Sequence, residues 1–434
     1  MVETVGEIGE QYSVDTPLSS EKQLVPEGYK ETEAGIIPDD WTATELGSAI
    51  KLQRGFDLPH RHRQKGVVPI VSSSGVTGFH NESKVSAPGV VTGRYGTIGQ
   101  IFYVEEDFWP LNTTLYVKEY NLTTPQYTFY LLKTVDFEAH SGKSGVPGVN
   151  RNDVHQEYIA VPPVLEQTAI SNALFDVDEL ISSLEDLIAK KQAIKTSALQ
   201  QLLTGCTRLP QFATHPDGHP KGIKQTEFGG IPEDWEVVSL DECTKKVGSG
   251  KTPTGGSSVY ADSGRPFIRS QNVGWGELDL SDVAHITEET HSTFAGTEIL
   301  KFDVLLNITG ASIGRCAIAD ERIAGGNVNQ HVCIIRTESR RLNPFLLVEL
   351  MNSRVGQDQI DSYQAGGNRE GLNFNQVRSL RFSIALNPEE QTAIANTLSD
   401  MDKEIQAFNL RLTKTRQIKQ GMMQELLTGR TRLV

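Results

Sequence analysis

The sequence predicts a mixed α/β protein in which two mainly β domains are joined by two long helices that pair as an antiparallel coiled coil. The first observation behind this prediction is a repeat: residues 166–209 and 390–433 align without a gap and are identical at 21 of 44 positions. A shorter repeat lies upstream of each copy, GIIPDDW at 35–41 and GGIPEDW at 229–235. Because a repeat on this scale reflects the architecture of a chain, we expect an internal pseudo-two-fold relationship between its halves.

Each copy of the longer repeat predicts one long helix, because its apolar residues recur at alternating spacings of four and three. Prolines stand just before the two starts, at 162–163 and 388, and no proline interrupts either run. Gly205 and Gly429 follow the last apolar pairs, at a position typical of a helix C-cap. The stripe residues are Ile170, Leu174, Val177, Ile181, Leu184 and Ile188 in the first copy, and Ile394, Leu398, Met401, Ile405, Phe408 and Leu412 in the second.

The two predicted helices are the natural partners of each other. A helix of about 40 residues is roughly 60 Å long and cannot bury an apolar stripe by itself. Antiparallel pairing of the two copies covers both stripes and relates the two halves by a pseudo-two-fold axis. The alternative is that each helix packs only on its own domain, but matching stripes at matching positions favour mutual pairing.

The regions between the helices read as β domains. Both contain short apolar runs bounded by turn residues, such as VVPIVSSSG at 67–75 and HVCIIR at 331–336. They differ strongly in sequence, yet traces of a shared plan remain, for example NRNDV at 150–154 and NFNQV at 373–377. We therefore expect a common scaffold with diverged surfaces. The predicted segments are a first β domain with an N-terminal segment at 1–160, a helix at 161–210, a linker with a second β domain at 211–386 and a helix at 387–434.

Composition allows nucleic-acid binding without requiring it. The net charge is −14, but residues 1–41 carry 2 basic and 10 acidic side chains, whereas residues 42–160 carry 11 of each. The four cysteines show no CxxC spacing, so neither a disulfide framework nor a zinc site is expected. There is no apolar run of 18 residues and no signal-peptide pattern, and a cytoplasmic location is expected.

The motif search predicts a chain without catalysis of its own. GSGKT at 248–252 resembles the end of a phosphate-binding loop, but Lys245 stands where that loop needs glycine. The sequence has no GxSxG, HExxH or EF-hand pattern, and no NPPY or DPPY tetrapeptide of an amino-methyltransferase. We therefore expect no catalytic residue, no metal and no cofactor in this chain.

Polar and basic turn residues are the remaining candidates for function. Arginine pairs with guanine, asparagine and glutamine pair with adenine, and all of these side chains, like lysine, can reach phosphates. For any one of them the alternative is an ordinary solvated surface residue, and the HRHRQK run at 60–65 is the least ambiguous group. The candidates for DNA binding are Arg54, His60, Arg61, Arg63, Lys65, Arg94, Tyr95, Lys143 and Arg151 in the first region, and Lys251, Arg265, Arg269, Gln271, Asn272, Arg315 and Arg369 in the second.

These features together resemble the specificity subunits of type I restriction–modification enzymes. The resemblance rests on GIIPDDW and GGIPEDW, on GTIG at 96–99 and GASIG at 310–314, on EQTAI at the start of each helix, and on the LLTGxTRL ending of both helices. It covers nearly the whole chain, and it implies two target recognition domains that each read half of a split DNA site. It also implies two methyltransferase subunits that modify adenine N6 with S-adenosylmethionine, and restriction subunits that use ATP and Mg²⁺.

We therefore expect a non-catalytic DNA-reading subunit. Helices of roughly 60 Å would separate two reading domains by more than one and a half turns of DNA, which suits two half-sites with an unread gap. One alternative is a coiled-coil adaptor that binds proteins. The other is a recognition subunit of a different restriction–methylation assembly.

Overall fold

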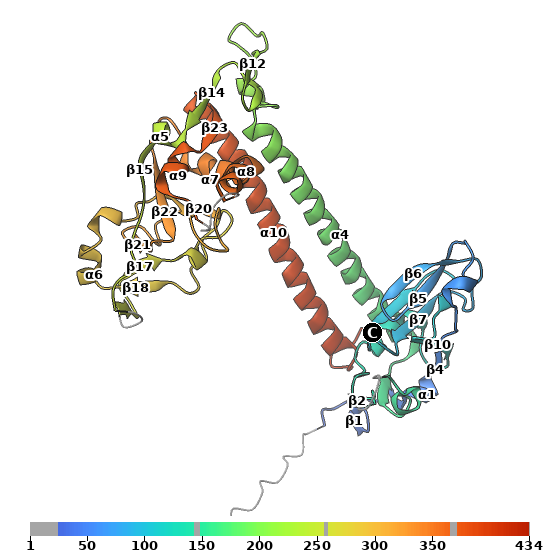
Figure 1. Cartoon of the computed structure of the whole chain (residues 1–434). Coiled ribbons are helices and arrows are strands. Elements are labelled where there is room, and N and C mark those ends of the chain that lie inside the picture. Colours follow the sequence, from blue (N-terminus) through green and yellow to red (C-terminus); the bar gives the residue numbers. More distant parts are fainter. Residues whose placement is uncertain (1–24, 143–147, 256–258, 365–370, 434) are drawn as a thin grey trace, which may run out of the picture. The chain divides into compact units, whose positions relative to one another are not determined.

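The computed structural model describes residues 25–142, 148–255, 259–364 and 371–433 (Figure 1). The chain divides into two units: Met1–Ser183 with Thr413–Val434 form the first, and Leu184–Leu412 form the second. Each unit combines a β-rich region with a part of each of two long helices, α4 (Val164–Leu203) and α10 (Pro388–Leu426). The predicted combination of β-rich regions and two long helices is confirmed. The unit boundaries fall inside the helices, so the predicted division into four segments stays a prediction.

The first unit is built on three antiparallel pairings and a smaller mixed sheet. A hairpin leads into a strand pair, a four-stranded sheet of order β4-β10-β7-β8 and a three-stranded sheet of order β6-β5-β9. The short helices are α1 (Leu46–Ala49), α2 (Pro125–Leu132) and α3 (Arg151–Val154). The strands are β1 (Tyr29–Thr32), β2 (Gly35–Pro38), β3 (Thr42–Glu45), β4 (Ile50–Arg54), β5 (Val68–Ser72), β6 (Gly75–His80), β7 (Gly89–Gly93), β8 (Ile101–Val104), β9 (Trp109–Pro110), β10 (Thr114–Tyr120) and β11 (Tyr158–Val161).

The second unit repeats this framework. Its hairpin, its strand pair and its four-stranded sheet of order β15-β22-β19-β20 correspond to those of the first unit, and a second sheet has the order β16-β18-β17-β21. Its shorter helices are α5 (Leu240–Cys243), α6 (Glu288–Ser292), α7 (Pro344–Asn352), α8 (Arg354–Gln364) and α9 (Phe374–Ser379). The strands are β12 (Ile223–Thr226), β13 (Gly229–Pro232), β14 (Trp235–Ser239), β15 (Thr244–Ser249), β16 (Tyr260–Ala261), β17 (Arg265–Ile268), β18 (Ala284–Ile286), β19 (Val304–Asn307), β20 (Cys316–Ile318), β21 (Asn327–Val328), β22 (Val332–Thr337) and β23 (Arg381–Ala385).

Short sequence similarities between the two regions correspond to equivalent local structures. Gly96 and Gly310 each turn the chain with φ of +76°, a left-handed value that glycine adopts without steric cost. Asn150 caps α3 by accepting the backbone N–H of Asn152, and Asn373 caps α9 by accepting that of Gln376. The shared scaffold that these motifs predicted is therefore present in both units.

The apolar stripes lie in the cores where the two long helices meet. In the first unit Ile170 and Leu174 of α4 belong to one core cluster with Leu426 of α10. In the second unit Leu202 of α4 shares a core with Ile394 of α10. The beginning of each helix thus packs against the end of the other, which is antiparallel pairing. None of the twelve predicted stripe residues is exposed, and seven of them are buried.

The left-handed glycines after the helices are close-packed as well. Gly205 and Gly429 have φ of +72° and +73°, as the predicted C-caps require. A Cβ atom at Gly205 would lie 2.5 Å from Pro232 Cδ, and one at Gly429 would lie 2.6 Å from Pro38 Cδ. Each helix end is therefore held directly against a hairpin of its own unit.

Candidate functional site

A cluster of charged side chains joins three repeated motifs in the first unit. Arg432 donates from Nε to Glu166 Oε1 over 2.6 Å, and from Nη2 to Asp40 Oδ2 over 2.8 Å. Trp41 Nε1 donates to Glu166 Oε2 over 2.8 Å. Glu166 is only 1% exposed, so its charge needs these partners. We call Asp40, Trp41, Glu166 and Arg432 the first clasp.

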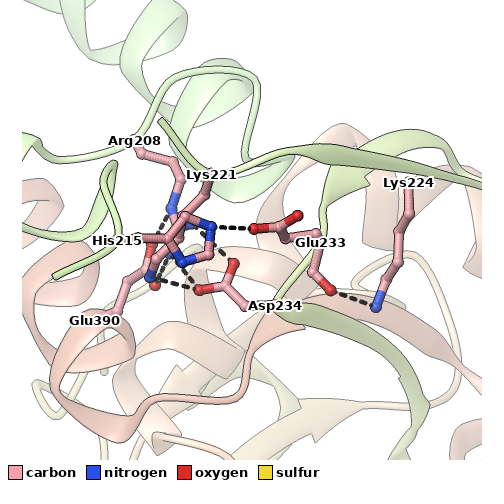
Figure 2. A network of polar contacts seen from close by, with 7 residues as sticks. All are labelled: Arg208, His215, Lys221, Lys224, Glu233, Asp234 and Glu390. Carbon is pink, nitrogen blue, oxygen red and sulfur yellow. Dashed lines mark hydrogen bonds and ion pairs between the residues drawn. The ribbon is translucent and has the colours of Figure 1, made fainter. Parts of the chain in front are cut away.

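The second unit holds the corresponding cluster, shown in Figure 2. Arg208 donates from Nε to Glu390 Oε1 over 2.9 Å, and from Nη1 to Asp234 Oδ1 over 2.8 Å. Lys221 Nζ donates to Asp234 Oδ2, also over 2.8 Å. We call Arg208, Lys221, Asp234 and Glu390 the second clasp. His215 pairs with the neighbouring Glu233 outside it.

The clasps explain why three motifs recur in the sequence. In each unit the arginine comes from LLTGxTRL, the glutamate from EQTAI and the aspartate from the PDDW or PEDW motif. The clasp therefore ties the end of one long helix to the start of the other, and ties both to the strand that enters the β region. Because the arginine neutralises the buried glutamate and is itself held by the aspartate, the repeats are structural in the first instance.

Charge compensation shifts the acid–base behaviour of the clasp residues. Hydrogen bonds that Arg432 donates to Glu166 and Asp40 raise its pKa above the ordinary value, so its guanidinium stays charged. Burial alone would raise the pKa of Asp234, but hydrogen bonds from Lys221 and Arg208 outweigh that effect and the pKa is lowered. Both groups are therefore ionised near neutral pH.

The glutamine of each EQTAI motif has a matching role. Gln167 and Gln391 are 0% and 1% exposed. Gln167 accepts the backbone N–H of Thr124 and donates to two carbonyl oxygens, and Gln391 accepts that of Asn343 and also donates to two carbonyls. These bonds fix the starts of α2 and α7 against the long helices. Sequence reasoning did not identify the clasp residues or these glutamines as the contacts that hold the helices to the β regions. Their recurrence in both halves of the sequence was the available signal.

The predicted basic cluster of the first unit lies on a surface loop. His60, Arg61 and Lys65 are exposed, and a short 3-10 helix spans His60–His62 (η1). Arg63 is half-buried, and its Nε donates to the carbonyl of Leu58 over 3.4 Å. The loop is thus anchored at one arginine while its other cations face solvent.

Three further candidates of the first unit line one cavity. Arg54, Arg94 and Arg151 surround a space of about 290 Å³, together with Leu115, Val149, Asn150 and Asn152. The guanidinium carbon of Arg94 lies 4.6 Å from the ring centroid of Tyr95. The sequence predicted these four residues one by one, and the fold brings them together.

The candidates of the second unit are more heavily engaged within the chain. Arg265 is held by Glu288 at 2.6 Å, and Arg269 and Gln271 both donate to Asp282. The guanidinium of Arg265 also donates to the carbonyl of Gly325, and its predicted contact with DNA stays a prediction.

Asn272 is placed inside the fold rather than on its surface. It is 1% exposed, its Oδ1 accepts the backbone N–H of Arg269, and its Nδ2 donates to the carbonyls of Asp279 and Asp282. The predicted DNA contact by Asn272 therefore conflicts with its burial. The side chain supports the loop that carries Arg269 and Gln271.

The remaining candidates of the second unit are divided between two places. Lys251 is exposed, with Nζ 4.9 Å from the ring centroid of Phe294, and Arg315 is half-buried next to the Gly310–Gly314 turn. Lys143 and Arg369 lie outside the described residues.

In the part of the chain that the structure describes, no group of three or more His, Cys, Asp or Glu side chains is placed to hold a metal ion. No helix among the described residues is long and apolar enough to cross a membrane. All four cysteines are free thiols, and only Cys206 is exposed.

This architecture, with paired helices, doubled clasps and two unlike β surfaces, defines a class of modular recognition protein. Comparison with known proteins agrees: residues 38–195 and 232–415 match the family model of the type I restriction modification DNA specificity domain. The chain belongs to this family.

Individual relatives extend the comparison over nearly the whole chain. The chain is 22% identical over 424 residues to the type I restriction enzyme MjaVIII specificity subunit of Methanocaldococcus jannaschii, covering 94% of this chain and 96% of that protein. It is 24% identical over 439 residues to the putative type I restriction enzyme MjaX specificity subunit of the same organism, covering 94% and 97%. The crystal structure of a type I restriction–modification S subunit from M. genitalium has the same fold, with a TM-score of 0.59, 14% identity, and coverage of 89% of this chain and 96% of that one.

Proposed function

We propose that this chain is the DNA-specificity subunit of a type I restriction–modification complex and reads a bipartite site, one half-site with each unit. The observation that carries the proposal is one repeated framework with two different sets of exposed side chains. Equivalent clasps and caps hold both β regions, whereas the candidate contact residues are not repeated. A shared frame with unlike surfaces suits two different half-sites.

Contacts to DNA are expected from the cationic loops. Exposed lysines and arginines bind phosphates, which gives affinity, and side chains that reach base edges give specificity. The loop around His60–His62, in which Arg61 and Lys65 are exposed, is the main candidate for phosphate binding in the first unit. In the second unit Lys251, Arg265, Arg269, Gln271 and Arg315 remain candidates.

The chemistry of the complex belongs to partner subunits in this proposal. Two methyltransferase subunits would modify adenine N6 with S-adenosylmethionine, and restriction subunits would use ATP and Mg²⁺. Two equivalent helix-and-clasp frames support two copies of the methyltransferase subunit, because each frame offers that partner the same backbone. The chain itself would bind none of these cofactors.

The deciding experiment is methylome sequencing of cells with and without this chain, in the presence of its partner subunits. We expect methylated adenines in one split motif, and the loss of that motif when the chain is removed. Exchanging residues 42–160 for a homologous segment should change one half of the motif only. A change in both halves would contradict the assignment of one half-site to each unit. If no motif depends on the chain, an adaptor that binds proteins becomes the better explanation.

A further inference from the structure

The arginine-lined cavity of the first unit has the features of a base-reading site. Arg54, Arg94 and Arg151 share it with the amides of Asn150 and Asn152, and no acidic side chain lines it. Its volume of about 290 Å³ leaves room for the edge of a nucleobase with its bound water. Three cations around one small space repel each other, so an electron-rich ligand is the natural occupant.

Arg94 is held differently from the other two arginines. Its guanidinium lies against the ring of Tyr95, with 4.6 Å between the guanidinium carbon and the ring centroid. The Tyr95 ring is in turn packed on Gly148, where an added Cβ would come within 2.1 Å of the ring. Stacking restricts the plane of the guanidinium, and a fixed donor fork is what bidentate pairing with guanine O6 and N7 requires.

The other two arginines are suited to phosphate binding. Arg54 makes an exposed ion pair with Asp57 at 3.1 Å, and such a pair is easily exchanged for a phosphate. Arg151 is exposed, with Nη1 3.5 Å from the carbonyl of Leu52. Neither side chain is stacked on a ring among the described residues.

The second unit shows which backbone position corresponds to Arg94. The carbonyl of Arg94 accepts the N–H of Val149 over 3.0 Å, and the carbonyl of Ile308 accepts that of Leu372 over 2.8 Å. Both pairs join the turn after the third strand of the four-stranded sheet to the segment before the capping asparagine. Ile308 therefore occupies the place of Arg94 in an otherwise equivalent frame.

The same comparison applies to the remaining arginines. Arg54 ends β4 and Ser249 ends β15, each paired with the central strand of its sheet. Arg151 follows the cap residue of α3, and Phe374 follows that of α9. All three arginines are thus replaced by uncharged residues at equivalent positions, while the frame around them is retained. Structural need does not explain the arginines, because the second unit folds the same frame without them.

We propose that Arg94, oriented by Tyr95, reads a guanine in the half-site of the first unit, and that Arg54 and Arg151 bind the adjoining phosphates. This inference rests on the proposed function. It makes Arg94 the residue that determines specificity at one base pair. The absence of a matching arginine in the second unit then means that its half-site is read by other side chains.

The test uses the full chain with its partner subunits in cells, with adenine methylation read across the genome. Arg94→Ala should keep the split motif but relax one guanine of the first half-site, lowering discrimination at that base pair by about 10- to 100-fold. Arg94→Lys should relax it too, because lysine keeps the charge and lacks the planar fork. Tyr95→Leu should give a weaker relaxation at the same base pair.

Arg54→Ala and Arg151→Ala serve as contrasting variants. Each should weaken binding at all sites and reduce the dependence of affinity on salt, without relaxing any base. Lys403→Ala, at an exposed pair on α10, is the matched control and should change neither property. Thermal unfolding of each variant shows whether the chain is folded, and the unchanged second half-site provides an internal check.

Two results would overturn the inference. One is an unchanged motif in Arg94→Ala, and the other is a uniform loss of methylation with every base still required. A first half-site that contains no guanine would have the same effect. The proposed function is tested separately by the wild-type chain, since a motif that depends on the chain supports it whatever Arg94 does.

Discussion

Lys195 Nζ lies 2.5 Å from Asp402 Oδ1, across the two long helices within the second unit. In the first unit Lys419 pairs with Asp178 in the same manner. The two pairs are equivalent under the repeat, since each residue has its counterpart 224 positions away. Both lysines continue the apolar stripe of their helix. A polar residue at such a position specifies the register of paired helices, because a shifted register would leave it without its partner.

Reversing the charge of Lys195 should therefore destabilise the second unit. We expect Lys195→Glu to lower the free energy of unfolding by about 1 kcal/mol, because it places like charges together at a partly exposed site. Thermal unfolding measures the loss. The double variant Lys195→Glu with Asp402→Lys should recover most of it, whereas Lys403→Glu, at an exposed pair, should have little effect. Equal losses in the single and double variants would contradict a direct interaction.

Removing the arginine of the second clasp should have a larger effect. The side chains of Arg208 and Glu390 are 8% and 2% exposed, so Arg208→Met leaves a buried carboxylate without its main partner. We expect a loss of about 3–5 kcal/mol in the free energy of unfolding, measured with urea. Arg208→Met combined with Glu390→Leu should regain much of the stability, because the buried charge is gone. If the double variant is no more stable than the single one, the loss comes from packing instead.

The second clasp also predicts a pH dependence. The lowered pKa of Asp234 means that its folded form holds a proton less readily than its unfolded form, so the carboxylate stabilises the fold above the unfolded pKa of about 3.9. This contribution should fade as the pH falls below about 4 and through the folded pKa. The difference in unfolding free energy between the wild type and Asp234→Asn should thus shrink toward acid pH. If the difference in unfolding free energy stays constant between pH 6 and about pH 3, the charge of Asp234 does not have this role.

The glycine at each helix end offers a test of local geometry. Gly205→Ala would add a Cβ 2.5 Å from Pro232 Cδ at a φ of +72°. We expect a loss of at least about 1–2 kcal/mol from the left-handed backbone alone. Gly421→Ala is the control within α10, since nothing lies within 4 Å of an added Cβ there, and it should stabilise slightly or not at all. Similar melting temperatures for both variants would show that the helix end has room to adjust.

The loop around η1 should contribute to DNA affinity through charge. Replacing Arg61, Arg63 and Lys65 together by alanine removes three cations, so the slope of log affinity against log salt should fall by up to about 3. Binding of the assembled complex to a target duplex, measured at several salt concentrations, gives that slope. An unaltered slope would show that these side chains remain in solvent when DNA is bound.

The sequence was sufficient to predict the helices and their pairing. The alternating spacing from Ile170 to Ile188 and from Ile394 to Leu412 could be read directly, because a helix repeats its surface every few residues. The capping glycines and the β character of the intervening regions were also accessible, since they depend on local chemistry.

The sites depended on contacts that no local pattern contains. Arg208 and Glu390 are 182 positions apart, and only the folded chain shows that they meet. Arg54, Arg94 and Arg151 were recognised singly, but their common cavity requires the pairing of β4 with β10. The burial of Asn272 was hidden for a related reason: an asparagine that bonds its own loop has the same sequence signal as one that faces solvent.

The clasps also determine which segments of such a chain can be replaced without loss of the contacts that hold it together. Trp41 and Glu166 mark the two ends of the first β region and are 125 positions apart, whereas Trp235 and Glu390 are 155 apart. The same attachment points accommodate segments of different length and sequence. Genetic recombination that replaces everything between these points would leave every clasp contact in place. A segment exchanged at either position would therefore meet an arginine, a buried glutamate and an aspartate that already hold one another.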